Sequence, residues 1–230
     1  AIAFYDKPHR KFARLLSTYV SCAPAGLKSF MQAIPLWMED RMHQREQVLD
    51  GLSNLGLGDT NKHKNLAFLE HHQSHAASAF YPSPYETAAV LTLDGVGEWA
   101  TTTIALGVGN KLEIQKEIHF PHSVGLLYSA FTYYLGFKVN SGEYKVMGLA
   151  PYGEPKYTGK IFKDLVDLKE DGSFRLNQKY FDYSTGLRMI NQYFEELFSS
   201  PARTPETLLT PFHMDIAASI QVACEEIVLR

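Results

Sequence analysis

The chain has 230 residues, of which 45% are hydrophobic and 20% are charged, and its formal net charge is −3. These values are typical of a globular protein with one large or two small domains. The negative net charge argues against a protein that binds a nucleic-acid backbone through bulk positive charge. No apolar run reaches the roughly 20 residues that are needed to cross a bilayer. Two cysteines far apart, Cys22 and Cys224, argue against a disulfide framework and favour a cytoplasmic location.

The first quarter of the chain is predicted to be mainly helical, because apolar residues recur at helical spacing and prolines interrupt them. The chain starts inside a strand pattern without methionine and ends inside a helix pattern, so we expect a fragment of a longer protein. The expected elements are a strand at 1–5, helices at 8–20 and 27–52, and a loop at 53–64.

Residues 65–153 carry the densest signals for secondary structure. Turn-forming pairs at Asp94-Gly95 and Gly109-Asn110 predict a strand, a turn and a hairpin. Ser123 can cap a helix that ends at Gly136, and the polar, glycine-rich stretch 140–153 is predicted to be a loop. The expected strands are 66–69, 88–93, 101–106 and 112–120, and the expected helices begin at 71 and 123.

After residue 155 the signals are weaker. We expect a helix near 156–168, a turn at Gly172 into a short strand, a linker over 201–211 and a helix from about Phe212. The whole pattern predicts an α/β protein with a mixed sheet flanked by helices.

A histidine pair and an aspartate form the first candidate site. His71 and His75 are four residues apart on a predicted helix, so both imidazoles project from one face. Asp94 ends a predicted strand and can add a carboxylate oxygen to two imidazole nitrogens, a donor set suited to a divalent metal. His72 points elsewhere, as an outer-sphere or surface residue. A histidine pair without a metal is the alternative.

Two loops could hold phosphate. Gly95 and Gly97 allow close backbone approach to a phosphate group, although an ordinary hairpin turn explains them equally. The stretch 140–153 contains Lys145, whose ammonium could offset phosphate charge or polarise a carbonyl; a solvated Lys–Glu pair is the alternative. His122 precedes a helix start and could face the same cleft, or it could be structural.

Taken together, these motifs resemble those of the nodulation-type and antibiotic-type O-carbamoyltransferases. The four matching stretches follow one another in order and at matching spacing. They are residues 71–80, 93–99, 120–132 and 141–153. The resemblance covers essentially the whole chain and is strongest over 66–155.

The resemblance implies an actin-like ATPase (ribonuclease H-like) fold, related to the tRNA threonylcarbamoyl-transfer proteins. It places 1–230 within an N-terminal domain with core motifs at 66–155, a helical insert at about 8–64 and a C-terminal part at 156–230. In such enzymes a further C-terminal domain makes carbamoyl-adenylate from carbamoyl phosphate and ATP. The actin-like domain transfers the carbamoyl group to a small-molecule hydroxyl in a biosynthetic pathway.

The resemblance also implies site residues. Iron is the metal associated with the family, and its ligands map onto His71, His75 and Asp94. The candidate catalytic residues are Lys145 and His122. The candidate residues for ATP or carbamoyl-adenylate are Gly95, Gly97, Ser141, Gly142, Glu143, Lys145 and Gly148. Because the adenylate-forming domain is missing, we expect no turnover by this chain alone, and neither nucleic acid nor membrane as a partner.

Two other functions stay open. One is a nucleotide-binding, actin-like protein without transfer activity. The other is a metal-dependent hydrolase, which would need a general-base carboxylate beside the histidines, where Glu70 is adjacent but lies outside the predicted helix. The ligand types alone suit iron, zinc and manganese, and the acceptor is not identified.

Overall fold

A computed structural model describes residues 2–41, 43–56 and 66–230. The chain forms two compact units. The first contains Ala1–Thr92 and Gly97–Glu117, and the second contains Leu93–Val96 and Ile118–Arg230. None of the helices within these described ranges combines the length and apolar character needed to cross a membrane.

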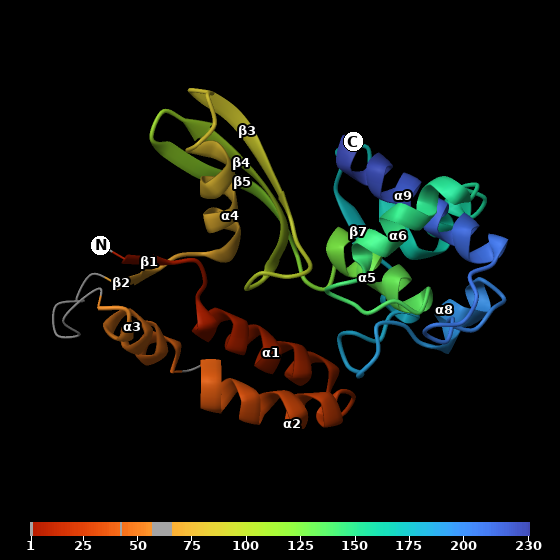
Figure 1. Cartoon of the computed structure of the whole chain (residues 1–230), viewed down its shortest axis with the longest axis horizontal. Coiled ribbons are helices and arrows are strands. Elements are labelled where there is room, and N and C mark those ends of the chain that lie inside the picture. The colour runs from red at the N-terminus through yellow and green to blue at the C-terminus, as the bar shows by residue number, and fades with distance from the viewer. Residues whose placement is uncertain (1, 42, 57–65) are drawn as a thin grey trace. The chain divides into compact units, whose positions relative to one another are not determined.

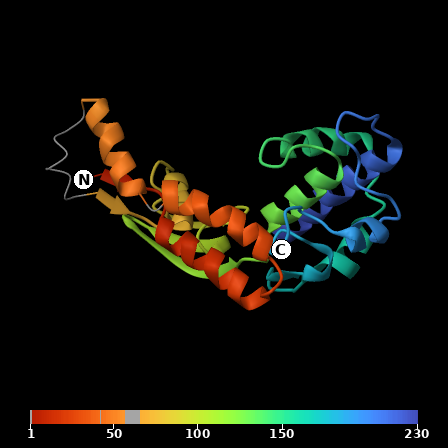
Figure 2. The same ribbon diagram turned by 90° about the horizontal axis from the view of Figure 1, so that it is seen from below.

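The helices of the first unit agree with the prediction that prolines divide the N-terminal region. Tyr19 and Phe30 stack with ring centroids 4.4 Å apart, which holds α1 and α2 side by side (Figure 2). The elements are α1 (Pro8–Cys22), α2 (Leu27–Leu36), the π-helical turn η1 (Trp37–Arg41) and α3 (Gln44–Asn54). The predicted loop begins inside α3, and its residues 57–64 lie outside the described residues.

Two small sheets complete the first unit. Strands β1 (Ile2–Phe4) and β2 (Leu66–Phe68) pair in parallel, with Ile2 opposite Leu66. Strands β3 (Thr87–Leu93), β4 (Ala100–Val108) and β5 (Lys111–His119) form a sheet in that order. Helix α4 (His71–Phe80) lies along one face of this sheet (Figure 1). The contact is an apolar cluster of Ala76, Phe80, Val90 and Ala105.

The second unit is built mainly of helices around an aromatic core. Phe131, Tyr134 and Phe194 are almost completely buried, and their rings meet edge to face with Phe194 5.1 Å from Phe131. The elements are α5 (Val124–Tyr134), α6 (Glu143–Leu149), η3 (Ala150–Tyr152), α7 (Thr158–Lys160), η4 (Ile161–Leu165), β6 (Val166–Leu168), β7 (Phe174–Leu176), η5 (Gln178–Tyr180), α8 (Gln192–Leu197) and α9 (Pro211–Leu229).

The α/β class is confirmed, but three small sheets replace the expected single mixed sheet among the described residues. The prediction of a loop at 140–153 was wrong, because residues 143–152 are helical. Val146 and Leu149, three residues apart, are both buried, so the segment has an apolar helix face that its glycines concealed. The helix expected at 156–168 ends at Leu165, because Val166–Leu168 pairs with β7 instead.

Helix α9 holds the end of this helical segment in place. The Asp215 carboxylate accepts hydrogen bonds from the Glu154 backbone N–H and the Lys156 ammonium, both at 2.8 Å. These bonds lower the pKa of Asp215, the Glu154 bond being the larger cause. A Cβ at Gly153 would overlap the backbone of Met214 and Asp215. The close contact between Gly153 and α9 therefore requires glycine at this position.

Replacing Gly153 with alanine should push this segment away from α9. We expect Gly153→Ala to lower the free energy of unfolding by about 1–3 kcal/mol, as other overpacked contacts do. Gly148→Ala is the matched control, because no atom lies within 4 Å of its added Cβ, and alanine favours the helix by up to about 1 kcal/mol. Hydrogen exchange of the α9 amides would report both changes, and equal protection in the two variants would contradict the packing argument.

Candidate functional site

Helix α4 begins at a buried carboxylate. Glu98 is only 6% exposed, and both of its oxygens accept hydrogen bonds from the His71 backbone N–H, at 3.2 and 3.0 Å. One of these oxygens also accepts the backbone N–H of Lys7, at 2.9 Å, just before α1. A carboxylate is favoured at a helix N-terminus, where backbone N–H groups lack partners within the helix. Glu98 therefore fixes the start of α4 and the backbone of His71.

Buried polar contacts fix the rest of this helix against the sheet. His72 is 2% exposed, and its Nδ1 lies 2.6 Å from the hydroxyl of Thr92 on β3. That hydroxyl lies 2.7 Å from the hydroxyl of Thr103 on β4. His72 therefore joins α4 to two strands. Of the two predicted alternatives for His72, the surface position was wrong.

The predicted histidine pair is close together. His71 is half-buried and His75 is exposed, and their Nε2 atoms are 3.1 Å apart across one helical turn. A metal–imidazole bond is about 2.1 Å long, so two nitrogens at this spacing are close enough to ligate one ion. The same spacing also permits a hydrogen bond between the two rings in one tautomer.

Asp94 follows β3 directly and brings a third donor. One ligand atom from each of His71, His75 and Asp94 lies within 4.8 Å of the other two. The Asp94 carboxylate accepts the Gly95 backbone N–H at 2.6 Å, and its backbone carbonyl accepts the Ser123 hydroxyl at 2.8 Å. This set of two nitrogens and one oxygen fits a divalent transition metal, including iron.

Gly97 is explained by packing. A Cβ at this position would lie 2.9 Å from the His72 ring and 3.0 Å from the His71 ring. The missing side chain thus leaves room for both imidazoles. A Cβ at Gly95 would meet only Leu126, at 4.0 Å. The predicted phosphate-binding role of Gly95 and Gly97 stays a prediction.

The nucleotide-binding candidates over 141–148 lie just before α6 and within it, in the second unit. The Glu143 carboxylate accepts hydrogen bonds from the Ser129 hydroxyl and the Asn140 backbone N–H, both at 2.9 Å, and from the Gly142 backbone N–H at 3.1 Å. Burial alone would raise the pKa of Glu143, but these bonds outweigh it and the pKa is lowered. Glu143 is therefore an anion that organises its own loop.

The other residues of this stretch are more accessible. Ser141, Lys145 and Gly148 are exposed, whereas Gly142 is buried. The Lys145 ammonium lies over the Phe137 ring, 5.8 Å from its centroid. Roles in catalysis or nucleotide binding for these residues stay predictions.

His122 also belongs to the second unit. Its Nδ1 accepts the Leu176 backbone N–H at 3.1 Å, so the neutral ring carries its proton on Nε2. Burial, and to a smaller degree the charge of Arg175, lower the pKa of His122 and favour this neutral form. In this tautomer Nε2 is a hydrogen-bond donor. As a catalytic residue, His122 would therefore donate a hydrogen bond through Nε2.

Comparison with known proteins gives a match along the whole chain. A family model described as "Carbamoyltransferase N-terminus" matches residues 1–230. The chain belongs to this family.

Several proteins with similar sequences are longer than this chain. A protein of Synechocystis sp. named sll1178 is 59% identical over 229 residues, which are 100% of this chain and 37% of that protein. Nodulation protein NolNO of Sinorhizobium fredii is 37% identical over 80% of this chain and 25% of its own length. For nodulation protein NolO of Bradyrhizobium diazoefficiens, the identity is 35% over 70% of this chain and 27% of its length. The chain thus spans about a quarter to two fifths of these relatives.

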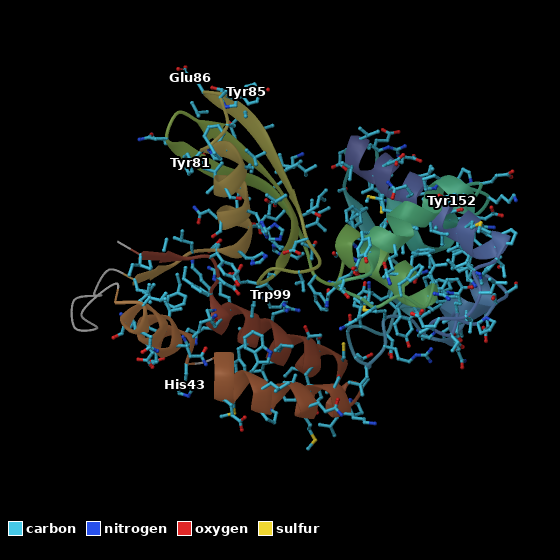
Figure 3. The ribbon with its side chains drawn as sticks, in the orientation of Figure 1. His43, Tyr81, Tyr85, Glu86, Trp99 and Tyr152 are labelled. Atoms are coloured by element: carbon cyan, nitrogen blue, oxygen red, sulfur yellow. The ribbon has the colours of Figure 1, made fainter. Side chains whose placement is uncertain are left out.

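Sequence reasoning identified the histidine pair and Asp94 but missed Glu98. The two backbone groups that Glu98 binds are 27 and 91 residues away in the chain, so no local spacing reveals the contact. Its position after the glycine turn was the only available signal. Figure 3 shows Trp99, the residue after Glu98, at one end of α4 and the sheet, with Tyr81, Tyr85 and Glu86 at the other.

Replacing Glu98 with glutamine should destabilise the first unit, because a neutral amide caps two helix starts less strongly. We expect the free energy of unfolding to fall by about 1–3 kcal/mol, the range for hydrogen bonds to a charged group. Both tryptophans, Trp37 and Trp99, belong to the first unit, so tryptophan fluorescence during urea titration follows this unit. Glu113→Gln on the exposed side of β5 is the control, and equal midpoints for the two variants would contradict the capping role.

Proposed function

We propose that this chain is the N-terminal part of an enzyme that transfers a carbamoyl group from carbamoyl-adenylate to a hydroxyl group of a small molecule. The family match over residues 1–230 carries this proposal. The names of two relatives, both nodulation proteins, are consistent with a biosynthetic role. We further propose that the fold is the actin-like ATPase fold, and that a domain beyond this chain forms the adenylate from carbamoyl phosphate and ATP.

The proposed reaction sets clear chemical requirements. The acceptor oxygen forms a bond to the carbamoyl carbon, the bond from that carbon to the phosphate oxygen breaks, and AMP leaves with the electron pair. The acceptor hydroxyl gives up its proton during transfer, and the departing phosphate of AMP can take it up. The site therefore needs a group that activates the carbonyl, positive charge near the departing phosphate, and a defined position for the acceptor.

Residues of this chain supply candidates for each requirement. His71, His75 and Asp94 would hold the metal, for which we propose iron. A metal ion bound there would supply Lewis-acid activation of the carbonyl. The Lys145 ammonium would offset phosphate charge as AMP leaves, and the Nε2–H of His122 would donate a hydrogen bond to an oxygen of the substrate.

The hydrolase alternative has weaker support. The Glu70 carboxylate accepts the Lys7 ammonium at 3.2 Å and lies 2.8 Å from the Arg10 guanidinium. The head groups of Lys7 and Arg10 thus occupy one oxygen of the carboxylate that a general base would use to accept a proton. A nucleotide-binding protein without transfer activity is the remaining alternative, and an activity assay separates it from the proposed enzyme.

Metal binding tests the histidine pair directly. We expect His75→Ala to lower metal affinity by at least the roughly 10–100-fold lost when a supporting residue is removed. In a longer polypeptide, with the length of the relatives, the rate of carbamoyl transfer should decrease together with the amount of bound metal. Gln73→Ala is the matched control, because Gln73 is an exposed residue on the same helix. Mass spectrometry of bound metal and circular dichroism of both variants would complete the test.

If His75→Ala keeps its metal and its activity, the histidine pair is structural. If transfer is absent in the wild-type longer polypeptide but carbamoyl-adenylate binds, the nucleotide-binding alternative holds. Turnover by the 230-residue chain alone would contradict the proposed need for a further domain.

Lys145 provides a second test of the mechanism. Removing a charge that stabilises the departing phosphate should lower kcat/KM for carbamoyl-adenylate by on the order of 100-fold. Lys138→Ala removes the same charge from an exposed residue nearby in sequence and should have little effect. Steady-state kinetics of Lys145→Ala and Lys138→Ala, at equal metal content, would decide the role. Equal rates in the two variants would exclude Lys145 from transfer.

A further inference from the structure

The first unit contains a cavity whose lining does not include the proposed metal ligands. Its volume is about 370 Å³, within the range of small-molecule sites. It lies where α1 and α3 begin and where β2 ends, next to His43, which is labelled in Figure 3. The side chains that matter for its chemistry are Lys7, His9, Arg10, Gln44, Arg45 and Phe68.

The lining of this cavity is positively charged. Lys7, Arg10 and Arg45 contribute three cations, and no aspartate or glutamate is among the described residues that line it. Glu70, outside the lining, contacts Lys7 and Arg10 through the same carboxylate oxygen. The carboxylates of Asp6 and Glu98 bind the backbone N–H of Lys7, and Asp6 also pairs with Lys11. The described side chains that line the cavity thus carry three positive charges, two of which share Glu70. An anion entering the cavity would therefore be stabilised electrostatically.

The ion pairs also limit the movement of two of these cations. Lys7 Nζ is 3.2 Å and Arg10 Nη1 is 2.8 Å from the same Glu70 oxygen, so both head groups lie close together. Holding two flexible side chains in place reduces the entropy lost when a ligand binds. Arginine and lysine head groups of this kind suit phosphate and carboxylate oxygens.

Two further residues shape the cavity. Phe68 contributes an apolar wall, and its ring packs 5.5 Å from that of Phe4. Gln44 is half-buried and offers an amide that can donate a hydrogen bond. An apolar wall with a few convergent polar groups is the usual composition of a small-molecule site.

We propose that this cavity binds a small molecule through a phosphate or carboxylate group. Its lining includes none of His71, His75 and Asp94, so the proposal does not depend on the proposed transfer reaction. The test is calorimetric titration of the 230-residue chain with inorganic phosphate and, separately, with acetate. Saturable binding of either anion, weakening as sodium chloride is raised, supports the site, and the tighter anion identifies the preferred group.

A charge added to the cavity wall gives a specific control. Gln44→Glu places a carboxylate in the lining at nearly constant side-chain volume, and an acidic residue in the first turn of α3 favours that helix. Gln47→Glu makes the same change on an exposed residue of α3 that does not line the cavity. We expect Gln44→Glu to weaken anion binding about threefold to tenfold more than Gln47→Glu.

Three results would overturn the proposal. The first is that neither anion shows saturable binding. The second is that Gln44→Glu and Gln47→Glu weaken anion binding equally. The third is that His75→Ala loses anion binding while Gln44→Glu binds the anion as the wild type does. Arg45→Ala provides a second variant, because Arg45 is exposed and its truncation should leave the fold intact. Its melting curve, followed by tryptophan fluorescence, would verify this, and undiminished anion binding in Arg45→Ala would also count against the site.

Discussion

The first unit depends on the burial of one carboxylate. Burying a charge is costly unless hydrogen bonds replace its water, and Glu98 obtains them from backbone N–H groups of His71 and Lys7. Two helices that are far apart in the sequence thus begin at the same side chain. As a result, Glu98 helps to set the position of the histidine pair, together with α4 itself.

The sequence predicted most of the local structure, because that structure depends on local patterns. The turn-forming pair Asp94-Gly95 located the strands expected at 88–93 and 101–106. Proline placed the break between α1 and α2, and Ser123 caps α5 as expected, its hydroxyl accepting the Leu126 backbone N–H. His71, His75 and Asp94 could be proposed for the same reason, since helical spacing and a strand end define where their side chains start.

Features that depend on tertiary packing could not be predicted. The glycines of 140–153 suggested a loop, whereas burial of Val146 and Leu149 against the second unit's core makes the segment helical. The packing of Gly97, whose missing side chain makes room for two imidazoles, also has no signal in the local sequence. The partners of Glu98 become visible only once the chain is folded. In each case the deciding contact joins residues that local sequence patterns do not connect.

The row formed by His72, Thr92 and Thr103 has a consequence for how this family changes over evolution. The hydroxyl of Thr92 contacts the other two side chains, so its hydrogen atom can point toward only one of them. Replacing Thr92 with an apolar side chain would leave His72 and Thr103 without this partner, and replacing either of those would remove one partner from the buried Thr92 hydroxyl. Positions 72, 92 and 103 are therefore expected to vary together among homologues, as a linked set spread over one helix and two strands.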